Sequence, residues 1–215
     1  MTHWPRTLPV LLALLAAVAV AAAACAPGGD PVEREDLPGI ILRADEAPEG
    51  TRKADVGGEQ GLDVFGRDAA ERAALVRDGF VTGYVAYFAP VAWFDPEEFV
   101  GEDAVAVQAI AGLFRDADGA SSSLRRYMDD LRNRQLEDAV DLEVPALGDE
   151  SFGLRGVAPT DGSPLLVYLV RVRNVILVVS GSGPVDQDAV SAAARAMADR
   201  AGRPGSHSPW VGISR

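Results

Sequence analysis

The sequence predicts an α+β protein in which an antiparallel β-sheet is packed against helices in a single domain. Helical and strand-like segments follow one another in the order helix, strands, helix, strands, helix, which is typical of this class. The strongest β signal is a pair of apolar runs, 165–172 and 175–179, separated by two residues as in a hairpin. Of the 215 residues, those after an apolar leader suffice for one domain of roughly 150 residues plus tails.

The leader predicts a signal peptide over residues 1–24. It has a weakly basic start, an apolar core from Leu8 to Val20 and small residues before Cys25, the only cysteine. The run Ala-Ala-Ala-Cys at 22–25 resembles a bacterial lipobox. That resemblance implies that the Cys25 thiol takes a diacylglyceryl group before cleavage and that the new amino terminus can be acylated, for example with palmitate. Simple secretion and an uncleaved anchor remain alternatives, although the apolar run is short for a membrane span.

Residues 25–36 have almost no apolar content and are predicted to form a disordered linker, followed by a folded domain over 37–202 and a polar tail over 203–215. A chain with one cysteine forms no internal disulfide, so stability must come from the core. The formal net charge of −12 argues against a nucleic-acid partner and against a surface that lies on anionic lipid.

The first half of the domain predicts one helix and two strands. Asp68 and Glu71 have the spacing of a capping box, and Gly79 can end the helix that they begin. The segment 80–88 is aromatic and β-branched and predicts a strand covered on both faces. Alternating apolar residues predict a second strand over 105–114, followed by a turn at 116–119.

The second half predicts a helix, a broken strand, the hairpin and a last helix. Apolar residues from Leu124 to Leu131 recur at helical spacing behind a serine cluster able to cap them. Glycines and Pro145 break a strand over 142–157. In the hairpin, Asn174 is the residue expected to take a positive φ. The helix over 186–201 is expected to bury its small residues against the sheet.

Three stretches of this domain are similar to uncharacterised lipoproteins of the bacterial cell envelope. They are the run Val-Pro-Ala-Leu-Gly-Asp-Glu-Ser at 144–151, the hairpin at 170–177 and the closing alanine-rich helix. Some of those lipoproteins share a fold with the PsbP and Mog-type proteins. The resemblance covers roughly residues 37–201 and implies an accessory or binding role.

The candidate site residues are few. After cleavage His207 is the only histidine, so a catalytic triad and a zinc site are improbable, and no metal or cofactor is expected. Asp149, Glu150 and Ser151 form the best polar cluster, because paired carboxylates can exchange protons or bind a cation. A solvated turn closed by hydrogen bonds from side chains to the backbone is the favoured explanation of the cluster. Five aromatic residues could line a pocket or fill the core: Tyr84, Tyr87, Trp93, Phe94 and Phe99.

These observations favour a lipid-anchored, extracytoplasmic module that binds a small apolar ligand or an envelope protein and performs no chemistry. One alternative is a carboxylate-dependent hydrolase, which needs two carboxyl groups converging in a cleft with perturbed pKa values. The other is a purely structural docking domain, which would expose an apolar patch.

Overall fold

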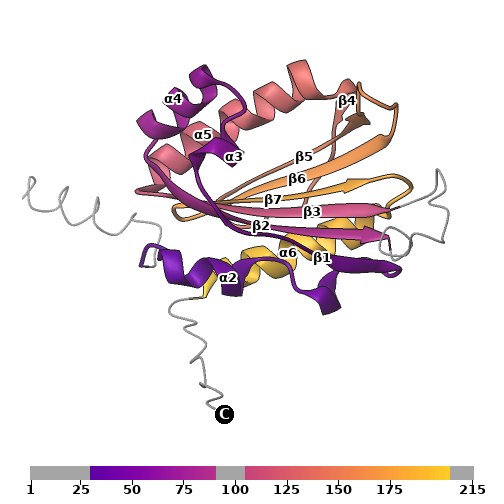
Figure 1. Cartoon of the computed structure of the whole chain (residues 1–215), viewed down its shortest axis with the longest axis horizontal. Coiled ribbons are helices and arrows are strands. Elements are labelled where there is room, and N and C mark those ends of the chain that lie inside the picture. Colours follow the sequence, from indigo (N-terminus) through magenta and orange to yellow (C-terminus); the bar gives the residue numbers. More distant parts are fainter. Residues whose placement is uncertain (1–29, 91–104, 204–215) are drawn as a thin grey trace, which may run out of the picture. The chain divides into compact units, whose positions relative to one another are not determined.

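The computed structural model describes residues 30–90 and 105–203. Over the described residues from Pro31 onward the chain forms one compact unit with a seven-stranded antiparallel sheet (Figure 1). The predicted α+β class is therefore confirmed. The strand order is β1-β2-β3-β7-β6-β5-β4, so the hairpin formed by the two most apolar strands lies near the centre of the sheet.

Fifteen segments of the described chain have regular structure, and those labelled η are short 3-10 or π-helical turns. In chain order they are η1 (Arg34–Asp36), α2 (Leu37–Ile40), η2 (Ala44–Glu46), β1 (Thr51–Gln60), α3 (Leu62–Phe65), α4 (Ala69–Arg77), β2 (Phe80–Pro90), β3 (Ala106–Phe114), α5 (Ala117–Asp130), η4 (Leu131–Gln135), β4 (Glu137–Asp141), β5 (Glu150–Val157), β6 (Pro164–Val172) and β7 (Val175–Ser182), and the last helix is α6 (Gln187–Gly202).

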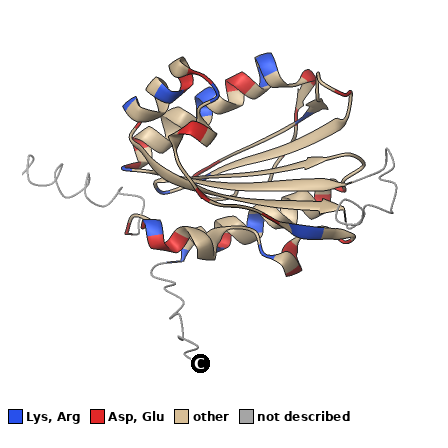
Figure 2. Ribbon diagram, viewed as in Figure 1, with Lys and Arg blue, Asp and Glu red and all other residues tan. Residues whose placement is uncertain are grey.

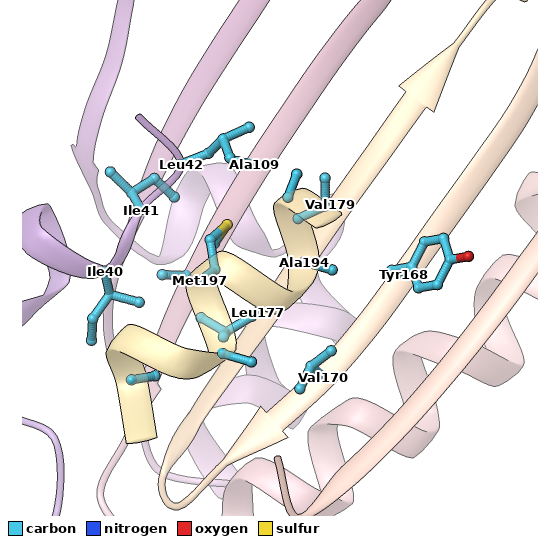
Figure 3. Packing of buried hydrophobic residues seen from close by; sticks show 14 of the residues in the cluster. Ile40, Ile41, Leu42, Ala109, Tyr168, Val170, Leu177, Val179, Ala194 and Met197 are labelled. Carbon is cyan, nitrogen blue, oxygen red and sulfur yellow. The ribbon is translucent and has the colours of Figure 1, made fainter. Parts of the chain in front are cut away.

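Helices cover both faces of the sheet. Helices α2 and α6 lie against one face, and α3, α4 and α5 lie over the other (Figure 1). On the first face Met197 and Ala194 of α6 pack over Leu177 and Val179 of β7 (Figure 3). Small residues on α6 let the helix approach the sheet closely, as the sequence predicted. The second face has its own apolar cluster, which includes Leu124 of α5.

Most predicted elements are confirmed, and the caps explain their bounds. Asp68 caps α4 by accepting a hydrogen bond from the Glu71 amide at 2.8 Å, and Gly79 has a φ of 78°. Helix α5 begins before the serine cluster expected to cap it. Asp116 is its N-cap and accepts from the Gly119 amide at 2.8 Å. The expected turn at 116–119 is therefore the first turn of this helix.

The β6–β7 turn differs from the prediction in one respect. Arg173, not Asn174, has the positive φ, at 54°. The Asn174 side chain is buried and acts as a clamp instead. Its oxygen accepts from the Val32 amide at 2.8 Å, and its amide nitrogen donates to the carbonyl oxygens of Val32 at 3.1 Å and Phe114 at 2.8 Å.

This clamp makes the ordered domain begin earlier than the sequence predicted. Val32 is buried and Arg34–Asp36 form a 3-10 helix, although both lie in the segment expected to be a disordered linker. The apolar residues that follow are buried against the first face of the sheet: Leu37, Ile40, Ile41 and Leu42. Two strands were not predicted from the sequence: β1 at one edge of the sheet and β4 at the other.

Candidate functional site

The second face of the sheet forms the floor of a cavity. The polarity of the residues on this floor changes along the strands. Antiparallel pairing places residues of β2, β3 and β7 side by side in rows. The first row has two glycines and an isoleucine, the second is wholly apolar, and the third is polar. From first to third the rows are Gly83–Gly112–Ile176, Val85–Ile110–Val178 and Tyr87–Gln108–Ser180.

An aromatic cluster closes the end of the cavity beside the glycine row. Phe65 of α3 contacts Phe80 with ring centroids 5.0 Å apart, and Phe80 meets Phe114 edge-on at 5.6 Å. The Phe65 ring stands directly over Gly83, where an added Cβ would lie 2.0 Å from Phe65 Cζ. Glycine at this position is therefore what allows the ring to close that end.

The opposite wall is formed by α4, α5 and η4, and it carries charge. Figure 2 shows acidic and basic residues gathered on these helices, whereas the central strands are almost uncharged. We call the charged residues of this wall the charged rim: Arg67, Glu71, Arg126, Asp130 and Arg134. With the floor and the aromatic cluster they line an open cavity of about 270 Å³.

Asp130 is the centre of the charged rim. Its side chain is only 6% exposed and pairs with both Arg67 and Arg134. Gln135 also donates to Oδ2 at 2.5 Å. Arg67 binds Glu71 as well, with Nε donating at 3.1 Å. These contacts come from Arg67, which precedes α4, and from η4, and they allow a carboxylate to lie at a largely apolar site.

Arg126 completes the charged rim, and its guanidinium group also has partners within the protein. It pairs with Asp78 at the end of α4 and donates to Ser123 Oγ at 3.1 Å. Three guanidinium groups thus face three carboxylates, those of Glu71, Asp130 and Asp78. Counted together with Asp78, which does not line the cavity, the charged rim has as many negative as positive groups.

Three other polar side chains line the cavity without a hydrogen bond to any of the described residues. They are Tyr87 and Gln108 on the floor and Tyr127 on the opposite wall. Burial raises the pKa of the Tyr127 hydroxyl, so this group stays protonated and can donate near neutral pH. These side chains are the polar groups of the cavity that are available to a ligand.

The carboxylates of the rim are poorly suited to proton transfer. Hydrogen bonds from Arg67 lower the pKa of Glu71, so this group remains ionised at neutral pH and is a weak base. The described residues contain no group of three or more histidine, cysteine or acidic side chains that could hold a metal ion.

The polar cluster singled out in the sequence lies elsewhere, at the end of β6 and the start of β5. Asp149 accepts from the Arg173 amide at 2.6 Å and from Arg171 at 3.0 Å. Glu150 accepts from Arg171 Nε at 2.7 Å and pairs with Arg125. Ser151 Oγ donates to the Pro145 carbonyl oxygen at 3.2 Å. Arg171 brings Asp149 and Glu150 together, whereas Ser151 bonds Pro145, so each of the three side chains already has a partner within the protein.

Only part of the predicted aromatic pocket can be located. Tyr87 lines the cavity, whereas Tyr84 packs against the core of the opposite face. Trp93, Phe94 and Phe99 lie outside the described residues, as does Cys25.

Sequence reasoning missed the charged rim because it paired the wrong residues. By their i, i+4 spacing, Arg125 and Arg126 would pair with Asp129 and Asp130 along the outer face of α5. Instead Arg125 binds Glu150, Arg126 binds Asp78, and Asp130 is buried against Arg67, 63 positions away. No local pattern indicates a partner at that distance in the chain.

No family model and no curated protein matches this sequence. Among solved structures, the extracellular domain of PknH from Mycobacterium tuberculosis is similar with a TM-score of 0.57 and 13% identity, over 81% of this chain and 98% of that domain. An uncharacterised protein from Mycobacterium smegmatis has a TM-score of 0.39 and 12% identity, over 72% of this chain and 92% of that protein. The likeness to the PknH domain is one of fold. The PsbP and Mog-type resemblance is not tested by these findings and stays a prediction.

Proposed function

We propose that this chain is a lipid-anchored, extracytoplasmic module that binds a small molecule in the cavity under α4 and α5 and performs no chemistry. The observation that carries the proposal is the cavity itself. Its floor is mainly apolar, and it has three polar side chains whose hydrogen-bonding groups are unoccupied by described residues. Ligand sites are commonly apolar cavities with a small number of placed polar groups.

The location and anchor rest on separate support. The lipobox-like run ending at Cys25 supports lipid attachment, and the similarity in fold to an extracellular domain supports a place outside the cytoplasm. No helix among residues 30–90 and 105–203 is long and apolar enough to cross a membrane. Since Val32 is clamped by Asn174, the chain from Cys25 to the domain spans at most about 25 Å. An acylated Cys25 would therefore hold the β6–β7 end of the domain close to the bilayer.

The proposal that the chain performs no chemistry is supported by the ionisation and the hydrogen bonding of the carboxylates in the charged rim. Glu71 has a lowered pKa, and Asp130 is occupied by two arginines and Gln135. A hydrolase of the carboxylate type needs one acid that holds a proton near neutral pH. A hydrolytic activity of the purified chain that Glu71→Gln abolished without unfolding would contradict this part of the proposal.

Binding is tested by filling the cavity. Saturation-transfer NMR with naphthalene-sized aromatic fragments should detect binding to the full chain. Ile110→Trp places a bulky ring in the middle row of the floor and should abolish the signal. Val140→Trp is the control, because Val140 is 47% exposed on β4 and does not line the cavity. Equal signals from both variants would show that the fragments bind elsewhere and would refute the site.

A further inference from the structure

We infer that the ligand of this cavity is an uncharged, mainly apolar molecule of roughly a dozen non-hydrogen atoms with a hydroxyl or carbonyl group at one end. The inference rests on the proposed function and adds the class of ligand to it. Three features of the cavity lead to this inference: its volume, the balance of its charges, and the change from apolar to polar residues along its floor.

The volume sets the size of the ligand. A cavity of about 150 Å³ in a protein core takes up benzene, which has six ring atoms. In proportion, about 270 Å³ accommodates roughly ten to twelve non-hydrogen atoms. A fused pair of six-membered rings with one substituent has this size.

The balance of charge excludes ions from the buried part of the site. An anion would have to take Arg67 or Arg134 away from Asp130, whose side chain is 6% exposed, and would leave a buried carboxylate without its partners. A cation would have to displace the same guanidinium groups from Asp130 or Glu71. An uncharged ligand leaves every pair of the charged rim intact.

The change from apolar to polar residues along the floor orients the ligand. Its apolar end meets the aromatic cluster, where Phe65 and Phe80 stack over the glycine row. Its polar end meets the third row, where Tyr87 and Gln108 are cross-strand neighbours. A hydroxyl placed there can both donate and accept, because Gln108 offers an amide with both functions and Tyr87 a hydroxyl.

The test compares four naphthalenes of similar size with the full chain near pH 7 and about 0.15 M salt, which screens the acidic surface. They are 2-naphthol, 2-methylnaphthalene, 2-naphthoate and 2-naphthylmethylammonium. We expect 2-naphthol to bind at least about tenfold more tightly than either ion. The affinity for 2-naphthol should exceed that for 2-methylnaphthalene by about two- to tenfold, which corresponds to the contribution of one hydrogen bond.

Two variants then test the orientation. Gln108→Leu and Tyr87→Phe remove polar atoms that bond no described residue, so the fold should be unaffected. At least one of them should lower the affinity for 2-naphthol about two- to tenfold and leave that for 2-methylnaphthalene unchanged. Equal losses for both compounds would overturn the orientation.

The outcomes separate this inference from the proposed function. Tightest binding by 2-naphthoate or by the ammonium compound, blocked by Ile110→Trp, would overturn the uncharged class and leave the binding site in place. If none of the four compounds showed binding that Ile110→Trp blocks, both this inference and the proposed function would be refuted.

Discussion

Asn174→Ala should destabilise the domain by about 3 kcal/mol, because this buried amide makes three hydrogen bonds. Two of them join Val32 and the third joins Phe114, and the side chain lies where the start of the domain meets the β6–β7 turn. One intramolecular hydrogen bond contributes about 1 kcal/mol, and a buried donor left unpaired costs about 1–3 kcal/mol. For a domain of this size about 3 kcal/mol corresponds to a fall of roughly 6–12 °C in Tm.

The assay is chemical denaturation of the full chain together with hydrogen exchange at the Val32 amide. We expect a lower midpoint and faster exchange at Val32. Asn133→Ala is the matched control, because Asn133 makes one exposed hydrogen bond, to the Asp129 carbonyl oxygen at 2.7 Å, and should cost less than about 0.5 kcal/mol. Equal midpoints for the two alanine variants, or unchanged exchange at Val32, would refute the idea that Asn174 clamps the start of the domain.

Three further predictions concern the anchor, the hairpin and the cavity. Cys25→Ala should lose both labelling by a palmitate analogue and membrane retention; persistent labelling would refute the anchor. Burial disfavours ionised Glu150, but hydrogen bonds from Ser121, Arg171 and Arg125 outweigh it and lower its pKa. Stability should therefore fall as the pH drops below about 4.5, and an unchanged pH profile in Glu150→Gln would contradict this. Gly83→Ala, which forces Phe65 aside, should cost about 1–3 kcal/mol by denaturation, whereas Gly39→Ala, exposed and unobstructed, should not destabilise.

The sequence predicts those parts of the fold whose signals are local. The alternation of Leu166, Tyr168, Val170 and Val172 along the sequence places them on one face of β6, where they are buried, and the small residues of α6 are buried as expected. Strand β1 gives no such signal. Its residues are mostly exposed, it contains adjacent glycines at positive φ, and a register shift interrupts its pairing with β2 between Lys53 and Gly57. An edge strand of this kind is held by its neighbour and has no apolar alternation to detect.

The site was less predictable than the fold because it depends on register and on distant pairs. Tyr87 could be suspected as an aromatic residue, but Gln108 becomes a site residue only because β2 and β3 pair with these two side chains opposite each other. Asp130 looked like part of an exposed helical face, and only its contact with Arg67 reveals that it is buried. Both facts are set by tertiary structure and have no local pattern.

A bulge in β2 decides which aromatic residues reach the cavity. Successive side chains of a strand point to opposite faces, so Phe80 would share a face with Tyr84 and Phe88 in a regular strand. The register of β2 against β3 shifts between Phe80 and Thr82, and the extra residue, Val81, is 49% exposed. The shift reverses the alternation. Phe80 thereby packs with Phe65 and Phe114 at the end of the cavity, whereas Phe88 lies in the core of the other face. The closed aromatic end is therefore a consequence of one irregular residue pair, which alternation along the sequence does not indicate.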